Sequence, residues 1–154
     1  MLASLPRSFL ASSALCLALV GTGAAPSAAQ TAGQKSLYER LGRYDAIAAV
    51  TDDFIGRLLN DKAFERFFIG HSTDSKQRIR QLIVEQLCAG AGGPCVYMGR
   101  TMKASHAGLG ITESEWNAAA QHLVASLDKF RVPQAEKDEV VAVVTSLKKD
   151  IVEK

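Results

Sequence analysis

The chain has a long glycine-rich connection at its centre, and any fold must accommodate it. This connection runs from Ala89 to Arg100 and contains Gly92-Gly93-Pro94. Only a short helix, expected from Lys103 to Leu109, separates it from the next long helix. Irregular backbone is hard to bury, because its polar groups lack regular hydrogen-bond partners. The middle third of the chain therefore cannot build an apolar interior of its own.

Amphipathic helices are expected on both sides of this connection. Apolar residues recur every three or four positions, and the sequence lacks sustained period-two alternation and Asn-Gly or Asp-Gly turns. Thr112 followed by Glu115 forms a capping box at the start of the most regular helix, and Pro133 suits the first position of the last one. The pattern predicts an all-α fold with helices at about 36–41, 44–60, 74–88, 103–109, 112–130 and 133–151, and a turn-like piece at 62–68.

The first thirty residues are predicted to be a targeting segment. Arg7 is their only charged residue, and residues 9–21 form an apolar run that is too short and too poorly flanked for a membrane span. A group of small residues ends at Ala29, where we expect cleavage; an uncleaved anchor is the alternative. Leu15 precedes Cys16 where a lipid-anchored protein would need a small residue, so no lipid anchor is expected. The chain is therefore expected to be periplasmic or secreted.

Residues 1–29 thus form the predicted signal peptide, and residues 30–154 one domain with a single core. The charge is nearly balanced, with 18 Lys and Arg against 16 Asp and Glu. No basic stripe with interleaved aromatic residues is present, so nucleic-acid binding is not expected. No later segment is long and apolar enough to cross a bilayer, so no stable membrane insertion is expected after cleavage.

Two cysteines remain in the predicted mature domain, Cys88 and Cys95. Export implies an oxidising compartment, and the glycine-rich loop between the two residues could bring them together. A disulfide that closes this small loop would contribute about 2–3 kcal/mol if it is unstrained. Two free thiols are the alternative.

A single histidine, His106, lies on the short helix between glycine-containing loops. The segment from Tyr97 to Thr112 places it just ahead of the long amphipathic helix. This layout suits an imidazole directed at a bound metal cofactor, and a flat apolar cofactor would supply the interior that the loops lack. The alternative is a surface histidine on a loop. His71 is expected to be solvated or close to the cofactor's carboxylates, and His122 to be structural or exposed.

Several short stretches share their order and spacing with one protein family. In chain order they are Leu37 to Gly42, Asp53-Phe54, Phe67-Phe68, Gly92-Gly93-Pro94, Tyr97-Met98-Gly99, Met102 with His106, and Gly110-Ile111-Thr112. On these residues the chain resembles the group I truncated haemoglobins over about 36–151. The resemblance implies a two-on-two helical sandwich around a b-type haem, with a nearly absent first helix and a short helix that bears the proximal ligand.

The resemblance also implies which residues hold the cofactor. His106 corresponds to the proximal ligand of the haem iron, in which one imidazole nitrogen binds the metal and the other donates a hydrogen bond that fixes the ring. The sequence has no Cys-x-x-Cys-His motif, which excludes covalent c-type attachment. The expected haem-contacting residues are Phe54, Ile55, Phe68, Ile79, Leu82, Ile83, Tyr97, Met102, Ile111, Trp116 and Leu123.

The residues expected above the iron depart from the family pattern. Many members have a tyrosine after the phenylalanine of the second helix and a glutamine on the facing helix, and both donate hydrogen bonds to the bound gas. Here Ile55 stands at the tyrosine position. Ile79 and Ile83 take the two facing positions. Gln86 is the closest polar residue, and Gln81 would reach the pocket only if the alignment shifted by two.

An apolar pocket of this kind should release oxygen quickly. A hydrogen bond to a charged group is worth roughly 1.5–3 kcal/mol, so its loss weakens oxygen retention by about tenfold to a hundredfold. Carbon monoxide and nitric oxide develop less charge and should be affected less. The pocket also offers no fixed acid or base for peroxide chemistry, and no internal sixth ligand is expected.

Three functions remain open on the sequence. The first is reversible binding of oxygen or another diatomic gas, for transport, storage or sensing. The second is an enzyme that detoxifies nitric oxide or peroxide at the same iron. The third is a helical module that only carries haem or binds none. The sequence contains no flavin or nicotinamide motif, so any redox cycle would need an external electron donor.

Overall fold

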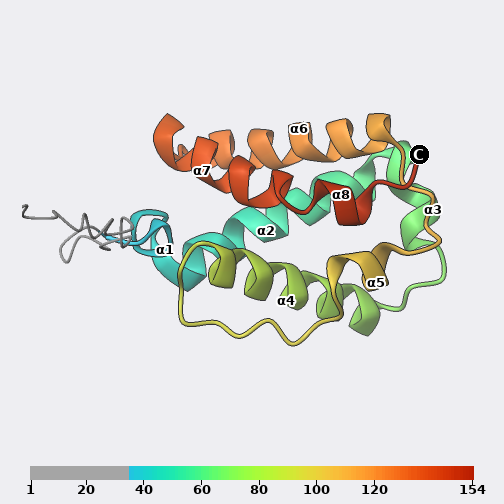
Figure 1. The fold of residues 1–154 in the computed structure, drawn as a ribbon, viewed down its shortest axis with the longest axis horizontal. Helices are drawn as coiled ribbons and strands as arrows, with labels where there is room; N and C mark the ends of the chain where they lie inside the picture. Colours follow the sequence, from blue (N-terminus) through green and yellow to red (C-terminus); the bar gives the residue numbers. More distant parts are fainter. Residues whose placement is uncertain (1–34) are drawn as a thin grey trace, which may run out of the picture. The chain divides into compact units, whose positions relative to one another are not determined.

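Helices make up the regular structure of the protein, seen in a computed structural model that describes residues 35–154 (Figure 1). No strand occurs in this part of the chain, which confirms the predicted all-α class. The predicted signal peptide, residues 1–29, lies outside the described residues. The elements are α1 (Leu37–Arg40), α2 (Arg43–Asn60), the 3-10 helix η1 (Lys62–Phe64), α3 (Glu65–Phe68), α4 (Thr73–Gly90), α5 (Met102–His106), α6 (Glu113–Lys129), α7 (Gln134–Thr145) and α8 (Lys148–Ile151).

Two pairs of helices form the body of this fold. Helix α2 packs against α4 and against α6, and α7 packs against α6. Figure 1 shows α6 and α7 lying side by side, with α2 and α4 beneath them and the short α5 next to α8, which it contacts. This arrangement is the predicted two-on-two sandwich, and α1 has only four residues, as expected for a nearly absent first helix.

Most helix starts follow from local capping. Thr112 and Glu115 form the predicted capping box at the start of α6, and Ser36 with Glu39 forms a second one on α1. The expectation for Pro133 was one residue off, because it is the N-cap residue of α7 rather than its first helical position. None of the helices between residues 35 and 154 is both long enough and apolar enough to cross a bilayer.

The last predicted helix is divided into two. Helix α7 ends at Thr145, and α8 begins at Lys148. The Ser146 hydroxyl donates a hydrogen bond of 2.6 Å to the Val143 carbonyl. A serine that bonds back to the preceding turn competes with the helical backbone ladder and favours a helix end. This local competition was not visible in the apolar spacing, which continues to Ile151.

The buried core lies between α1, α2, α6 and α7. Its largest cluster combines the side chains of Leu37, Val50, Leu123, Leu127 and Val140. Each such side chain contributes roughly 1.5–3 kcal/mol when it is fully buried. A large cavity occupies the other end of the helix pairs.

A disulfide joins α4 to the segment between α4 and α5, residues 91–101, which is here named the strap. Cys88 and Cys95 are bonded with their Cα atoms 5.8 Å apart, so the disulfide rather than two free thiols is present. The Gly93 amide also donates to the Cys88 carbonyl at 2.8 Å. A Cβ at Gly93 would lie only 2.6 Å from the Tyr38 ring, so this close approach requires glycine.

Candidate functional site

A cavity of about 450 Å³ opens between α4, α5 and α6. Its size falls in the range of small-molecule and cofactor sites, and most of its wall is apolar. All but one of the predicted contact residues line it. They are Phe54, Phe68, Ile79, Leu82, Ile83, Tyr97, Met102, Ile111, Trp116 and Leu123, together with His106.

Ile55 is the predicted contact that the structure places elsewhere. Its side chain is buried, at 8 % exposure, but it does not line the cavity. Phe54 and Leu58 present helix α2 to the cavity instead. Successive residues of a helix point some 100° apart, so Ile55 points in a different direction from Phe54.

His106 lies at the end of the five-residue helix α5, on the cavity wall. Its Nδ1 is 2.8 Å from the Met102 carbonyl oxygen and 3.0 Å from the Ser105 hydroxyl. A carbonyl can only accept, so Nδ1 carries the proton in this bond and Nε2 keeps a free lone pair. This tautomer is the one in which an imidazole can ligate a metal.

Helix α5 is positioned by its own cap and by the strap. The Thr101 hydroxyl accepts a hydrogen bond from the Ala104 amide at 3.2 Å and so fixes the first turn. The Tyr97 hydroxyl donates to the Arg100 carbonyl at 2.7 Å, which turns its ring along the cavity wall. Burial, and then repulsion from Glu85, raises the pKa of Tyr97, so its hydroxyl stays protonated at neutral pH.

Helix α4 presents an apolar stripe to the cavity. Ile79, Leu82, Ile83 and Leu87 recur at helical spacing on this face. Gln86 is the only polar side chain of α4 on the wall, and it has no hydrogen-bond partner in residues 35–154. Gln81 does not line the cavity, so the shifted alignment is not needed.

The Gln81 amide is already engaged outside the cavity. It exchanges hydrogen bonds of 3.1–3.2 Å with the Tyr44 hydroxyl and donates to Glu85 at 3.1 Å. His122 also has a structural role, as expected, because its Nε2 lies 2.8 Å from an Asp61 carboxylate oxygen. That contact lowers the pKa of Asp61.

The one acidic residue of the cavity wall is neutralised by an arginine. Glu115 accepts bonds of 2.8 and 3.1 Å from Arg66 and one of 2.9 Å from the Thr112 amide. The Thr112 amide first, and then Arg66, lowers the pKa of Glu115, so the carboxylate stays charged and fully engaged. It is therefore not available as an acid or base inside the cavity.

Sequence reasoning missed part of the wall. His71 from the loop before α4 lines the cavity, which fits one of its two expected roles. Most of the other unpredicted wall residues lie on the apolar faces of the predicted helices, and Phe64 and Phe67 come from the predicted turn-like piece. These unpredicted residues include Leu58, Phe64, Phe67, Leu87, Leu109, Ala119, Ala120, Val143, Val144, Leu147 and Ile151. Helical spacing predicts an inward face but does not distinguish a packed core from a cavity wall.

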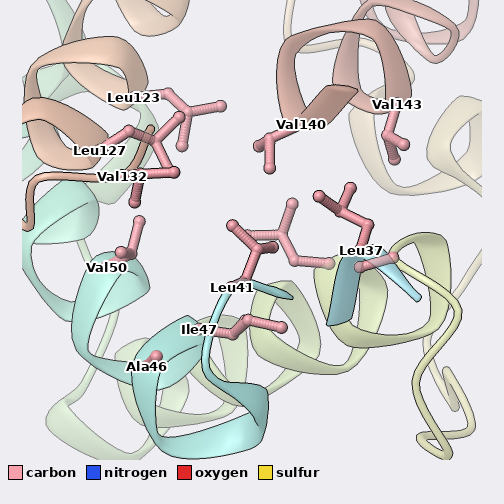
Figure 2. Close-up of a pocket in the computed structure, with 12 residues that line it drawn as sticks. Leu37, Leu41, Ala46, Ile47, Val50, Leu123, Leu127, Val132, Val140 and Val143 are labelled. Atoms are coloured by element: carbon pink, nitrogen blue, oxygen red, sulfur yellow. The ribbon is translucent and has the colours of Figure 1, made fainter. Parts of the chain in front are cut away.

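A second, smaller cavity of about 30 Å³ lies in the apolar core (Figure 2). Figure 2 shows side chains of α1, α2, α6 and α7 turned toward it, among them Leu37, Val50 and Val140. Leu87, Leu123 and Val143 line both cavities. The apolar interior therefore continues from the large cavity into the core.

The protein side chains around the cavity can bind a metal only together with another molecule that supplies further ligands. No cluster of three or more His, Cys, Asp or Glu side chains suited to a metal ion occurs among residues 35–154. A porphyrin brings four nitrogen donors of its own and needs one axial ligand from the protein. His106, whose Nε2 is free on a largely apolar wall, is therefore a donor that suits haem, and the cavity fits it.

Comparisons with known proteins agree with this geometry. The family model for bacterial-like globins matches residues 36–153. A group 1 truncated hemoglobin from Mycolicibacterium paratuberculosis is 33% identical over 116 residues, which cover 75% of this chain and 83% of that protein. The Fe(III) structure of the truncated hemoglobin from Tetrahymena pyriformis has 28% identity and a TM-score of 0.71, and covers 78% of this chain and 100% of its own. The 2/2 hemoglobin from Synechococcus, solved with covalently attached heme, has 30% identity and a TM-score of 0.69, at the same coverage.

The chain belongs to the bacterial-like globin family, and within it to the group 1 truncated haemoglobins. Its cofactor is haem, and it binds diatomic gases through the haem iron. Of the third possibility raised by the sequence, the variant in which the helical module binds no haem is thereby excluded.

Proposed function

We propose that this protein reversibly binds oxygen or another diatomic gas at a b-type haem ligated by His106. The bond between His106 Nδ1 and the Met102 carbonyl carries the proposal, because it leaves Nε2 free on the wall of the haem-sized cavity. Haem supplies an iron that binds gases once an imidazole holds its other face. The chain's own part is to orient that ring and to exclude water.

We further propose that the opposite wall makes oxygen release fast. The side chains of α2 and α4 that face the cavity are apolar except Gln86, and Ile79 and Ile83 are among them. Apart from Gln86, this wall has no side chain that donates a hydrogen bond to a polarised gas, and it has no acid or base for peroxide chemistry. These features favour gas binding for transport, storage or sensing over detoxification.

The spectrum of the purified domain, residues 30–154, tests the ligand assignment. We expect a Soret band in the wild type, its loss or displacement in His106→Gly, and its recovery when free imidazole is added. His122→Gln is the matched control, because it removes an imidazole outside the cavity and keeps a donor for Asp61. A wild-type spectrum in His106→Gly without added imidazole would refute the proposal.

Mixing the oxygen-saturated protein with nitric oxide tests the choice between binding and detoxification. We expect nitrate to form in a single turnover at most, because residues 30–154 carry no flavin or nicotinamide motif and the mixture contains no electron donor for the iron. Sustained nitrate production after addition of NADH alone would contradict both the binding role and the need for an external electron donor.

We also propose that residues 1–29 direct export to the periplasm or the exterior. The Cys88–Cys95 disulfide supports an oxidising compartment. A fusion of residues 1–34 to alkaline phosphatase, which is active only after export, should give active enzyme, and Arg7→Glu should reduce it by weakening the charged start of the signal. Phosphatase that stays inactive would count against export.

A further inference from the structure

The loop that follows His106 is held in place by residues that lie outside the loop. Helix α5 has only five residues, too few to be stable by itself. Residues 107–112 connect it to α6, and Gly108 and Gly110 have positive φ values of 81° and 61°. Glycine adopts this conformation readily but does not enforce it. The path of the loop, and with it the place of α5, must therefore be determined by its partners.

One carboxylate spans the two glycines. Glu153 Oε1 accepts a hydrogen bond of 2.6 Å from the Gly108 amide, and Oε2 accepts one of 2.6 Å from the Gly110 amide. The Glu153 amide in turn donates to the Ile111 carbonyl at 2.8 Å. Bonds from amides to a carboxylate are charge-assisted and stronger than neutral ones. Glu153 thus fixes the loop at three positions.

A second side chain, that of Arg66, binds the carbonyl groups of the same loop. Arg66 donates to the Leu109 carbonyl at 2.7 Å and to the Gly110 carbonyl at 3.3 Å, while Glu115 fixes the guanidinium. Helix α8, two residues before Glu153, also packs against α5. The amides are therefore held by Glu153 and the carbonyls by Arg66.

We propose that Glu153 is a positioning residue for the proximal imidazole, an inference that rests on the proposed ligation by His106. The ring makes its hydrogen bonds only to Met102 and Ser105 in α5, so it moves with that helix. The helix in turn follows the loop that Glu153 holds. Glu153 therefore sets how closely the imidazole approaches the iron, although it touches neither the ring nor the haem cavity.

Glu153→Ala, Glu153→Gln and the control Asp150→Asn test this role in the haem-loaded protein. Asp150 lies in α8, and its side chain makes no hydrogen bond or ion pair within residues 35–154. The readouts are the iron–histidine stretching band of the ferrous protein by resonance Raman and the rate of haem transfer to an acceptor globin. The band reports the axial bond itself, which a purely structural role would leave unchanged.

In Glu153→Ala the band should shift and haem transfer should accelerate by at least about tenfold, because both charge-assisted hydrogen bonds to the carboxylate are lost. Glu153→Gln, which keeps one acceptor oxygen, should fall between Ala and wild type, and Asp150→Asn should match wild type. If Glu153→Ala does not fold, Glu153→Gln decides on the same band. An unchanged band in the folded variants overturns the inference, whereas a His106→Gly protein with a wild-type spectrum would instead overturn the ligand assignment.

Discussion

Asp53 shows how single residues hold the helix pairs together beside the haem cavity. Its carboxylate on α2 accepts bonds from Arg57 Nε at 2.7 Å and from the Ser126 hydroxyl of α6 at 2.8 Å, and pairs with Lys129. Lys129 first, and then Arg57, holds the pKa of Asp53 well below its usual range. The Asp53 side chain is only 13% exposed but Lys129 is 58% exposed, so solvent screens the contact with Lys129 more than the contact with the buried Ser126.

Replacing Asp53 with Asn should destabilise the fold at neutral pH by roughly 1–3 kcal/mol, because Ser126 and two cations lose a charged partner. A depressed folded-state pKa stabilises the protein above the ordinary aspartate value of about 3.9, and this contribution is lost as the pH falls further. The difference between variant and wild type in urea unfolding should therefore be constant from pH 7 to about pH 5 and shrink only as the pH falls below about 4. Asp52→Asn, at a side chain that is 59% exposed and paired with Arg80, should change stability by less than about 1 kcal/mol. Equal effects of the two substitutions would contradict this account.

Ile83 tests the apolar wall at the level of one side chain. Ile83→Gln would place an amide donor in the cavity, and oxygen dissociation should slow by about tenfold or more. Carbon monoxide release should change much less, because that ligand develops less charge. Stopped-flow measurements of both gases on the same variant separate a hydrogen bond from a steric effect. A parallel change in both rates would point to sterics.

The sequence could place residues on the cavity wall where a short motif fixes their positions relative to one another. Ile79, Ile83 and His106 follow from short motifs at constant spacing, and all three line the cavity. Ile55 was placed by analogy with a tyrosine position, and the rotation of α2 puts Phe54 and Leu58 on the wall instead. A one-residue difference in helical phase cannot be read from spacing, because adjacent positions can both be buried.

At the scale of elements, the strap depends on its disulfide. Residues 91–101 contain no helix or strand, and Cys88–Cys95 joins their first half to α4. The Met98 amide adds only a long contact of 3.4 Å to Glu85. Since the strap leads directly into α5, its attachment affects how firmly the haem is held.

Cys88→Ala/Cys95→Ala should therefore lower stability by about 2–3 kcal/mol and speed up haem loss. Alanine suits the site because Cys88 is fully buried, at 0% exposure, and a serine hydroxyl there would lack a partner. Thermal melts with and without dithiothreitol provide the check. The reductant should lower the wild-type midpoint to that of the double variant and leave the variant unchanged. A wild type that is insensitive to full reduction would contradict the prediction.

Helix positions were predictable where local signals agree. The capping box at Thr112 and the apolar spacing of α2, α4 and α6 all point to the same elements. The break between α7 and α8 escaped prediction because the apolar spacing continues across it, and the disulfide remained open because spacing alone cannot show whether two cysteines meet.

For the described part of the molecule as a whole, the apolar interior has two unequal halves. One is the packed core of Leu37, Val50, Leu123, Leu127 and Val140, which needs no cofactor. The other is the cavity of about 450 Å³, whose opposite walls are connected mainly by contacts with the group that fills it. Haem binds only the folded state, so it stabilises the fold by mass action, and this gain belongs to the elements that surround it.

Removing the haem should accordingly loosen residues 70–110 far more than α6 and α7. Amide exchange of the holo and apo proteins, followed by mass spectrometry, measures this directly, because exchange reports the free energy of local opening. We expect protection in the second half of α4 to survive in part, since Val84 and Cys88 belong to a separate buried cluster with Ile47. The second half of the strap should exchange almost freely, because Tyr97 lines the cavity, whereas α5 should lose only part of its protection, because α8 and the loop bound by Glu153 hold it from outside. Equal protection of residues 70–110 in both forms would mean that the cavity walls hold themselves, and that the cofactor is bound by a preformed site rather than completing the interior.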